Sequence, residues 1–512
     1  MINNNLHILL KPWIQHAPNI ILNNIVSDNR NAMGQDLLVT LPGNITNGRY
    51  YIFQAIQQNI SAIITEKKKK NGNIEIFNNI PIIYFPSITK NLSKLAGRFY
   101  KNPSHSLHLT GITGTNGKTT ISHLLSQWAT LLGTKSAIMG TIGNGIINHH
   151  IYPTKNTTDS AIHIQKFLYK IKKLGINFVS LEISSHALAQ YRVENLFFQV
   201  AIFTNLSHEH LDYHKNMLHY EQTKWKLFSK LKVKKYIINA NDKIGQKWLL
   251  KLQSKKHQNI TTAVSSHYIP SFFSIWKGKW LYAHNIQYYS NKTCIFFKSS
   301  WGNATIYSPL LGKYNVDNIL LIISTLLEYK YSLSQLIHTV NKLKPIPGRM
   351  ETFNIQNKPK IIIDYAHNPR ALKETLQNLR YHCTGKIWCI FGCGGNRDKY
   401  KRSIMGNISE KYSDNVIITD DNPRNETPKK IIQEIIHGIH NTKKIQIIHN
   451  RKKAIEKTIQ SASPNDLILI AGKGHETYQI IGNKYQPYSD SNTVKKLLGI
   501  KYHDSMYTLY NT

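Results

Sequence analysis

The loop at residues 114–120 constrains the fold of this chain more than any other feature of its sequence. It follows an apolar stretch at 107–112 and leads directly into a helical pattern that Gly133 is predicted to end. In such a strand–loop–helix unit, glycines let backbone N–H groups converge on phosphate oxygens, a lysine adds positive charge, and the next hydroxyl can hold Mg²⁺. The loop residues are Gly114, Thr115, Asn116, Gly117, Lys118, Thr119 and Thr120. The chain is therefore predicted to use a nucleoside triphosphate.

This loop departs from the usual phosphate-loop pattern at its first position. Counting back from Gly117 and Lys118, the first glycine of the standard motif would fall at Ile112, whereas the chain has its glycine at Gly111. The alternative reading is a glycine turn that merely opens a helix.

Composition limits the class of protein. At 512 residues the chain is too long for one ordinary core, and length alone predicts about three domains. The net charge of +37 raises the alternative of nucleic-acid binding. However, the lysines are spread along the whole chain among many asparagines and isoleucines, whereas a binding surface would be clustered and rich in arginine. The lysine run at 67–70 is interpreted as a solvated loop, and no nucleic-acid partner is expected.

The cysteines and the apolar runs indicate a cytoplasmic enzyme. Four cysteines, Cys294, Cys383, Cys389 and Cys393, are too few and too poorly spaced for a disulfide framework or a zinc site. No apolar run approaches the length that crosses a bilayer, and the polar N-terminus lacks a secretory pattern. We expect small-molecule substrates, no membrane partner and a monomer.

Short apolar runs alternate with longer helical patterns, which predicts an α/β fold with mainly parallel sheets. We expect three domains, at 1–90, 91–345 and 346–512, with the Pro-Ile-Pro-Gly segment at 345–348 as a linker. Residues 265–308, rich in aromatic and polar side chains, are predicted to be antiparallel. The predicted strands lie at 36–40, 62–65, 82–85, 178–183, 200–203, 236–238, 360–363, 387–391, 416–419 and 467–470.

Polar or glycine-rich motifs follow all four strands predicted in the third domain, where open α/β sheets place their ligands. They begin at Asp364, Gly392, Asp420 and Ala471. Arginine side chains in these motifs can grip a carboxylate bidentately, and their acidic side chains can accept from an ammonium group. This mixed polarity suits an amino acid. The alternative interpretation of the Asp364 motif is an ordinary turn at a helix N-terminus. Such a turn is compatible with a role in ligand binding.

Two further motifs follow strands of the second domain. Glu182 emerges at a strand end beside hydroxyls and is a candidate Mg²⁺ ligand, the alternative being a solvated glutamate. Residues 204–214 contain three histidines, His208, His210 and His214, which alone suggest zinc, although no ligand spacing fits well.

Taken in order, these motifs resemble the Mur ligase family, the ATP-dependent amide-forming enzymes of peptidoglycan precursor synthesis. The resemblance covers nearly the whole chain and is most specific at the Asp-Asn-Pro-Arg segment, 421–424, which is typical of members that add meso-diaminopimelate. It implies an N-terminal domain for the UDP-linked substrate, a central phosphate-loop ATPase domain and a C-terminal Rossmann-like domain. Lysine-adding members usually differ at the arginine, and only diaminopimelate has the extra carboxylate that a guanidinium can clamp.

Carried over residue by residue, the resemblance implies a catalytic centre on ATP and Mg²⁺. Lys118 would contact the transferred phosphoryl group, and Thr119 and Glu182 would hold Mg²⁺. His210 would bind a second Mg²⁺ with Lys224, which matches the family's carbamylated lysine (N6-carboxylysine); an ordinary surface lysine is the alternative. The adenosine side would comprise Asn315, Asn318, Arg349, Asp364 and His367.

The resemblance also assigns both organic substrates. The muramoyl-dipeptide positions are Asn156, Thr157, Thr158, Ser184, Gln190 and Arg192, and the uridine positions are Ser27 and Asn29. The diaminopimelate positions are Arg397, Asp421, Asn422, Pro423, Arg424, Gly472 and Glu476. Three departures bear on the sugar-nucleotide site: Asp159 replaces a small or apolar residue, Asn29 replaces a serine, and residues 44–46 read Asn-Ile-Thr instead of His-Gln-Ala.

The expected reaction is ATP-dependent addition of meso-2,6-diaminopimelate to UDP-N-acetylmuramoyl-L-alanyl-D-glutamate through an acyl phosphate. A lysine-adding or folylpolyglutamate-type ligase would share the ATP site without the arginine clamp. A nucleic-acid-binding protein of another class would show steep salt dependence and no phosphate release.

Overall fold

The computed structural model describes residues 4–41, 52–66, 72–85, 87–254, 261–500 and 508–509. Residues 44–46 and 67–70, on which two predictions fall, lie outside these ranges. The chain forms two compact units: Met1–Ala263 with Lys277–Lys279 and Leu509–Thr512, and Val264–Trp276 with Trp280–Thr508. The segment 345–348 lies within the second unit, and the domain boundaries at residues 90 and 345 stay predictions.

The first 100 residues form a small mixed sheet. Its order is β1-β2-β3-β5-β4, in which only β4 (Ile74–Phe77) runs antiparallel to its neighbour. The other strands are β1 (Ile25–Val26), β2 (Leu37–Val39), β3 (Ala62–Thr65) and β5 (Ile80–Tyr84). Since side chains alternate along a strand, Leu37 and Val39 face one core and Leu38 faces another.

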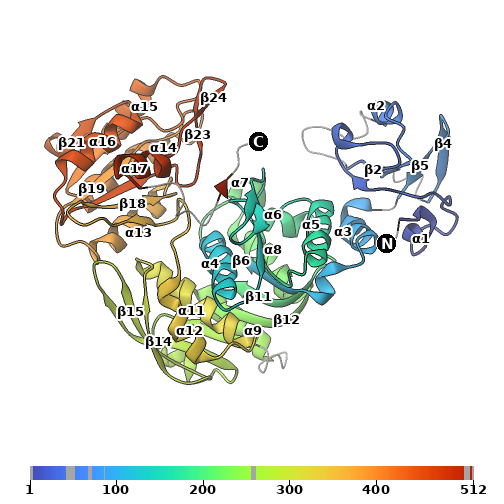
Figure 1. Ribbon diagram of the computed structural model, residues 1–512, viewed down its shortest axis with the longest axis horizontal. Coiled ribbons are helices and arrows are strands. Elements are labelled where there is room, and N and C mark those ends of the chain that lie inside the picture. The colour runs from blue at the N-terminus through green and yellow to red at the C-terminus, as the bar shows by residue number, and fades with distance from the viewer. Residues whose placement is uncertain are drawn as a thin grey trace. The chain divides into compact units, whose positions relative to one another are not determined.

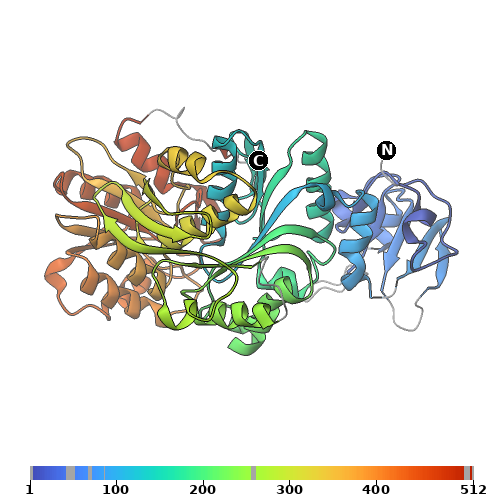
Figure 2. The ribbon, with the colours of Figure 1, turned by 90° about the horizontal axis from the view of Figure 1, so that it is seen from below.

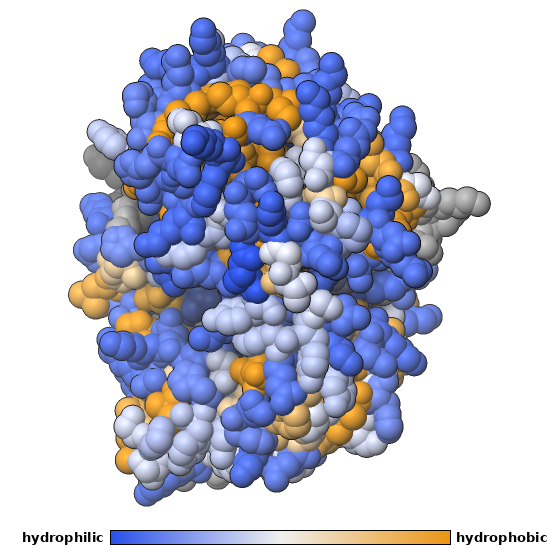
Figure 3. All heavy atoms as spheres, turned by 90° about the vertical axis from the view of Figure 1, so that its left-hand side faces the viewer, coloured by the Kyte–Doolittle hydropathy of each residue, from blue (hydrophilic) through white to orange (hydrophobic). Residues whose placement is uncertain are grey.

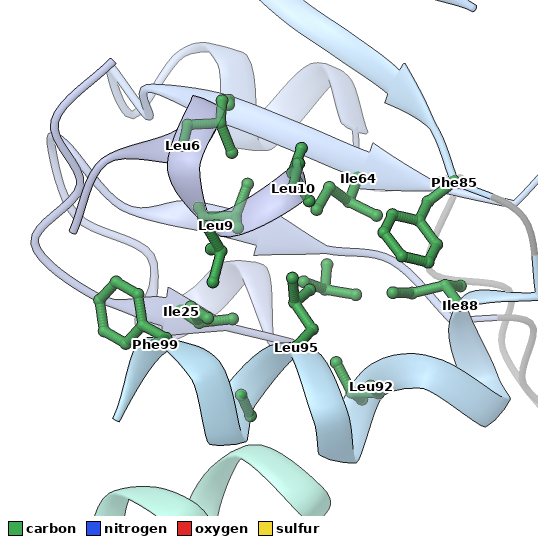
Figure 4. Close-up of a cluster of buried hydrophobic side chains, with 14 of the residues drawn as sticks. Leu6, Leu9, Leu10, Ile25, Ile64, Phe85, Ile88, Leu92, Leu95 and Phe99 are labelled. Atoms are coloured by element: carbon green, nitrogen blue, oxygen red, sulfur yellow. The ribbon is translucent and has the colours of Figure 1, made fainter. Parts of the chain in front are cut away.

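The larger of these two cores lies between the sheet and helices α1 (Leu6–Leu10) and α3 (Ile88–Phe99). Figure 4 shows Leu92 and Leu95 of α3 pointing toward the strands, with Phe85 and Ile64 opposite them. The smaller core packs under α2 (Ile52–Ile56). The predicted strand at 62–65 is therefore confirmed, and those at 36–40 and 82–85 overlap strands β2 and β5.

The sheet that carries the phosphate loop contains, in order, β12-β11-β6-β10-β7-β8-β9. Its first five strands are parallel, and β8 and β9 run antiparallel at its end. Helix α4 (Lys118–Leu131) packs on β10 and β7, and Figures 1 and 2 show α3 and α5 (Ala161–Lys173) side by side. The strands are β6 (His108–Thr113), β7 (Ser136–Met139), β8 (Asn144–Ile146), β9 (His150–Tyr152), β10 (Phe178–Glu182), β11 (Phe197–Phe203) and β12 (Lys232–Asn239).

The helices of this region join successive strands of the parallel sheet, as βαβ units require. Gly133 follows α4 with a left-handed φ of 88°, which confirms the predicted helix stop. The helices are α5 (Ala161–Lys173), α6 (Ser185–Ala189), α7 (Leu211–His214), α8 (Met217–Ser229) and α9 (Lys243–Ser254).

The second unit begins with the predicted antiparallel region, which is confirmed. Strands β14 (Lys279–Tyr288), β15 (Thr293–Ser299) and β16 (Ala304–Ser308) pair antiparallel in sequence order. They follow β13 (Thr261–Ser265) and α10 (Pro270–Phe273), and lead into α11 (Lys313–Glu328) and α12 (Leu333–Thr339). Helix α11 is buried along most of its length, and its buried side chains include the polar Asn315, Asn318 and Thr325 beside an apolar majority.

The last sheet has the order β17-β18-β22-β19-β20-β21, parallel except for β17. Helices cover both of its faces, as the two cores on either side of it show. The strands are β17 (Glu351–Phe353), β18 (Lys360–Asp364), β19 (Ile387–Phe391), β20 (Asn415–Ile418), β21 (Ile445–Ile447) and β22 (Leu467–Ala471). The helices are α13 (Pro369–Arg380), α14 (Tyr400–Tyr412), α15 (Pro428–Ile436), α16 (Arg451–Ser461) and α17 (Asp490–Leu497). This doubly wound sheet confirms the predicted α/β class.

Hydrophilic side chains cover most of the face drawn in Figure 3, and apolar residues gather there in separate patches. Exposed large apolar side chains of the second unit include Tyr381, Ile404 and Ile447. Scattered apolar residues of this kind are ordinary on a folded surface. Within the described residues, no helix has both the length and the apolar character needed to cross a bilayer.

A buried histidine links the antiparallel strands to the last sheet within the second unit. His382 Nε2 accepts from the Gly312 N–H at 3.0 Å, and its Nδ1 lies 2.6 Å from the Tyr289 carbonyl oxygen. Nε2 must therefore be unprotonated, with the proton on Nδ1. Burial lowers the pKa of His382 below its ordinary value, in agreement with this tautomer.

This histidine makes stability depend on pH. Because the folded pKa is depressed, the unfolded chain binds more protons below about pH 6.5, so stability falls as the pH drops below that value. We expect His382 to contribute a slope of up to about 1.4 kcal/mol per pH unit to the unfolding free energy. Urea unfolding between pH 5 and 7.5 should show a flatter slope for His382→Gln, whereas the exposed control His437→Gln should match the parent. Equal slopes for all three proteins would contradict the assignment.

Candidate active site

The predicted phosphate loop lies between β6 and α4, with Gly117 as the helix N-cap residue. Its shape is held from the loop after β11: the Asn205 carbonyl accepts from Thr115 N–H at 2.8 Å, and Asn205 Oδ1 accepts from Asn116 N–H at 2.9 Å. Gly114 has φ +151°, and a Cβ there would lie 1.9 Å from Thr204 Oγ1. Only glycine fits that position without a shift, so the loop conformation is built into the fold.

Two lysines converge on the carbonyl of Gly114. Lys118 Nζ donates to it at 2.9 Å and to the Thr115 carbonyl at 2.7 Å, and Lys224 Nζ donates to it at 2.8 Å. Lys224 comes from α8, is 1% exposed, and has its ammonium nitrogen 4.7 Å from the centre of the Tyr220 ring. Burial, and then the nearby Lys118 charge, lower the pKa of Lys224 well below its ordinary value. The structure thus brings the two lysines together and favours a neutral amine at Lys224.

Glu182 is fully buried at the end of β10, next to the phosphate loop. Its carboxylate accepts from Thr119 Oγ1 at 2.9 Å, and from the backbone N–H and hydroxyl of Thr141 at 2.9 and 3.0 Å. Burial raises the pKa of Glu182, and the hydrogen bonds and Lys118 oppose that shift. A Cβ on Gly140 would lie 2.0 Å from Glu182 Oε1, so the carboxylate fills the space that this glycine leaves.

Thr141 was not among the predicted site residues. It follows β7, which pairs with β10, so its hydroxyl meets Glu182 at the carboxyl edge of the sheet. A polar residue directly after a parallel strand was the available signal. The alternative that Glu182 is a glutamate in solvent at a strand end is excluded, because its side chain is buried.

The histidines of 204–214 spread over different environments. His210 is exposed, with its ring centre 5.3 Å from that of His186 and 6.2 Å from that of Tyr220. His214 is buried, its Nε2 lies 2.9 Å from Ser185 Oγ, and burial lowers its pKa to about 4. Among the described residues, no three His, Cys, Asp or Glu side chains form a metal-holding group. The zinc alternative therefore has no cluster to support it.

A cavity of about 1440 Å³ lies in the first unit and is lined from both 23–41 and 153–213. Of the residues predicted for the UDP-linked substrate, Ser27, Asn156, Gln190 and Arg192 line it. Asn29 is not in the lining, and its Nδ2 donates to Gln54 Oε1 at 3.2 Å. The cavity also contains Asp159, whose carboxylate lies 3.2 Å from His163 Nδ1.

The remaining predicted dipeptide residues connect this cavity to Glu182. Thr158 Oγ1 donates to the Glu182 carbonyl at 2.7 Å and accepts from Ser184 N–H at 2.9 Å. Arg192 Nη1 donates to the Thr158 carbonyl at 2.6 Å. Thr157 accepts from the Thr141 hydroxyl at 3.2 Å. The segment 156–158 therefore lies between the cavity wall and the carboxylate beside the phosphate loop.

The predicted adenosine residues lie in the second unit. Asp364 accepts from Met350 N–H at 2.9 Å and Ala366 N–H at 3.0 Å, and burial raises its pKa. The Arg349 guanidinium carbon lies 4.6 Å from the centre of the Tyr365 ring. On α11, Asn315 Nδ2 donates to the Leu311 carbonyl at 2.7 Å, and Asn318 Nδ2 donates to Asn315 Oδ1 at 3.2 Å. His367 is exposed beside Tyr365.

The predicted acceptor residues gather at one edge of the last sheet. They follow β19, β20 and β22, which are parallel neighbours, so their carboxyl ends meet. Asn422 Nδ2 donates to Glu476 Oε2 at 3.0 Å, and a Cβ on Gly472 would lie 3.5 Å from Asp421 Oδ2. Arg424 is half-buried and Arg397 exposed.

Two glycines let the arginine loops approach each other. Arg424 Nη1 donates to the Gly395 carbonyl at 3.0 Å, and a Cβ on Gly394 would lie 2.9 Å from Arg424 Nη1 and 3.5 Å from Arg397 Cγ. A Cβ on Gly395 would meet the Pro423 carbonyl at 1.8 Å. The two guanidinium groups therefore belong to loops in direct contact.

Fold and site together define a class: a strand–loop–helix unit with a buried carboxylate beside the loop is the arrangement of a nucleotide-dependent enzyme. Residues 112–326 match the model of the Mur ligase middle domain, and residues 348–474 match that of the Mur ligase glutamate ligase domain. A curated relative from Buchnera aphidicola subsp. Schizaphis graminum, a UDP-N-acetylmuramoyl-L-alanyl-D-glutamate--2,6-diaminopimelate ligase, is 48% identical over 97% of this chain and 99% of its own length.

Solved structures agree with these matches. A UDP-N-acetylmuramoyl-L-alanyl-D-glutamate--2,6-diaminopimelate ligase superposes with a TM-score of 0.72 and 28% identity, covering 99% of this chain and 100% of that one. The fold is also similar to that of a MurF ligase from Thermotoga maritima in complex with ADP, with a TM-score of 0.61, 17% identity and coverage of 93% and 96%. The chain belongs to the Mur ligase family.

Proposed function

We propose that this protein is an ATP-dependent ligase that joins meso-2,6-diaminopimelate to UDP-N-acetylmuramoyl-L-alanyl-D-glutamate in peptidoglycan precursor synthesis. One observation carries the choice of acceptor: Arg424 Nη1 lies 3.4 Å from the Asn422 carbonyl, and the Asn422 side chain donates to Glu476, so one residue contacts both a guanidinium group and a carboxylate. A zwitterionic amino acid with an extra carboxylate requires groups of both charges. The relative named above is a ligase for this amino acid and matches this chain over almost its full length.

In the first step, the side-chain carboxylate of D-glutamate attacks the γ-phosphorus of ATP. The new bond is an acyl phosphate, and ADP leaves. Lys118 balances charge on the transferred phosphoryl group, and the backbone N–H groups of the loop and of the first turn of α4 bind phosphate oxygens. The cavity lined by Ser27, Asn156 and Arg192 would hold the UDP-linked dipeptide.

The donor set beside the loop fits Mg²⁺, since the Thr119 hydroxyl and the Glu182 carboxylate present oxygen atoms 2.9 Å apart. Magnesium sites commonly use one or two carboxylates with water and phosphate oxygens, so a cluster of three protein ligands is not required. When bound, the ion would neutralise developing charge on the phosphates. Thr119 and Glu182 would hold it, and His210 with a carbamylated Lys224 would hold a second ion.

In the second step, the amine of diaminopimelate attacks the acyl carbon. The tetrahedral intermediate expels phosphate, the amine loses a proton, and an amide remains. Arg397 and Arg424 would grip the distal carboxylate, while Asp421 and Glu476 would accept from the distal ammonium group. Such anchoring turns the attack into an effectively unimolecular step.

The function is tested by incubating the protein with ATP, Mg²⁺, the UDP-linked dipeptide and one candidate amino acid at a time, with mass analysis of the product. Diaminopimelate should give the UDP-linked tripeptide with release of ADP and phosphate. Efficient incorporation of lysine, or glutamylation of a folate, would instead support the other ligase types. Absence of any product, with salt-sensitive binding to DNA or RNA, would contradict the proposal.

The proposed carbamylation of Lys224 has a direct test. The neutral amine adds to carbon dioxide, a nitrogen–carbon bond forms and a proton is released to solvent. Because the pKa of Lys224 is well below its ordinary value, we expect the carbamate to form at neutral pH. NMR with isotopically labelled carbon dioxide should show a carbamate signal that Lys224→Met lacks and the exposed control Lys230→Met retains. The Lys224→Met variant should also lose about 100-fold or more in kcat. A carbamate-free parent with full activity would contradict this role.

A further inference from the structure

Lys473 lies between Gly472 and Gly474 on the loop after β22, and its side chain is fully buried. Both flanking glycines have left-handed φ values, +111° and +52°. These turns direct the chain around the lysine, and its ammonium group lies against Asp421, Asn422 and Glu476, which with Arg397, Arg424 and Gly472 are assigned to diaminopimelate and are called the acceptor pocket below. A buried ammonium group must be matched by acceptors, because leaving it unpaired would be costly.

Three acceptors surround Lys473 Nζ: Glu476 Oε2 at 3.0 Å, Asn422 Oδ1 at 3.1 Å and Asp421 Oδ1 at 3.4 Å. An ammonium group has three N–H bonds, so these acceptors can use its full capacity. All three belong to residues that the proposed function assigns to diaminopimelate. Lys473 therefore contacts three of the residues assigned to the substrate.

The contact with Asn422 determines which way its amide faces. Asn422 Oδ1 accepts from Lys473 and from Ile480 N–H, at 3.1 and 3.0 Å, and Nδ2 donates to Glu476 at 3.0 Å. With the ammonium group in place, the oxygen must face Lys473. Removing it would leave the carboxylates of Asp421 and Glu476 without their shared cation.

Charge adds a consequence for substrate choice. Among the side chains assigned to diaminopimelate, Arg397 and Arg424 balance Asp421 and Glu476, and Lys473 adds one further positive charge; the nearby Glu426 pairs with Arg402. A pocket with this excess favours a zwitterion, whose carboxylate it attracts, over an amino acid that ends in a bare ammonium group. Without Lys473 the charges would be equal, and the penalty against a cationic end would fall.

We propose that Lys473 is a positioning and specificity-determining residue of the acceptor pocket: it holds Asp421, Asn422 and Glu476 in place and supplies the positive excess that selects diaminopimelate over lysine. This inference rests on the proposed function. Lys473 would act without contacting the substrate itself.

The test is steady-state kinetics of Lys473→Met, which keeps similar length and removes the charge. We expect KM for diaminopimelate to rise at least about tenfold, and the kcat/KM preference for diaminopimelate over lysine to fall by about tenfold or more. KM for ATP and for the UDP-linked dipeptide should rise much less than KM for diaminopimelate, since the three contacts of the Lys473 ammonium group described above go to residues assigned to diaminopimelate. The matched control is Lys457→Met, an exposed lysine on α16.

A double variant covers the case in which the single substitution prevents folding. Lys473→Met with Glu476→Gln removes one carboxylate along with the cation. This double variant should fold, and it should bind diaminopimelate no worse than the weaker-binding of the two single variants. Unchanged KM and amino-acid preference in Lys473→Met would overturn the inference, as would an equal rise in KM for all three substrates or strictly additive effects in the double variant. A parent protein that makes no tripeptide would refute the proposed function instead.

Discussion

Replacing Glu182 with glutamine is expected to lower kcat by roughly 10³-fold while leaving the fold intact. Glutamine keeps the volume and can still accept from Thr119 or Thr141, but the charge that would hold Mg²⁺ is gone. Phosphate release with all three substrates measures the loss, and raising the Mg²⁺ concentration should not restore the rate.

Stability separates this catalytic effect from damage to the fold. Because burial raises the pKa of Glu182 above its unfolded value, the ionised carboxylate costs stability as the pH rises through the folded pKa. Glutamine avoids that cost, so Tm at pH 7 should be equal to or above that of the parent. Ser122→Ala, which removes a longer contact of 3.4 Å to the same carboxylate, should lose less than about tenfold in kcat. A Glu182→Gln enzyme with nearly parental kcat would contradict the proposed metal role.

Replacing Arg424 with alanine is expected to raise KM for diaminopimelate by about 100-fold, with little change in KM for ATP. The guanidinium group would grip the distal carboxylate bidentately, a geometry that lysine cannot reproduce, so Arg424→Lys should also bind poorly. Initial rates at saturating ATP and UDP-linked dipeptide, with diaminopimelate varied, give the KM directly.

The control for Arg424 is Arg370→Ala, an exposed arginine on α13 that pairs with Glu374. It should bind diaminopimelate as the parent does, since surface ion pairs contribute little. If Arg424→Ala used diaminopimelate with an unchanged KM, the clamp would be wrongly placed. If it accepted lysine as well as diaminopimelate, the arginine would be confirmed as a source of discrimination.

Local patterns predicted much of this site. The phosphate loop could be recognised because Gly114, Gly117 and Lys118 act within one turn of chain, next to the strand and helix they join. The acceptor motifs could be placed at one edge because parallel strands align their carboxyl ends. Their roles as ligands stay predictions until the kinetics above are measured.

Residues that act over long sequence separations were missed. Lys473 stands between two residues predicted to bind the acceptor, yet its partners Asp421 and Asn422 lie more than 50 positions away. Thr141 reaches Glu182 across 41 positions. No local pattern marks Lys473, and the position of Thr141 after β7 does not by itself indicate that its side chain reaches Glu182. Asn29, predicted for the uridine site, is not in the lining of the cavity, and its side chain donates to Gln54, so its role stays a prediction.

The sequence by itself determined the α/β class, the phosphate loop, the strand-end motifs and the family. Each of these depends on the spacing of nearby residues, because helices, strands and turns each require their own local spacing. Only the tertiary structure decided which side chains are buried and which are paired. It buried Glu182 and Lys224, and it brought Lys473 into contact with the carboxylates of Asp421 and Glu476. Burial and pairing depend on packing between distant segments, and they set the charge states on which the chemistry of this site depends.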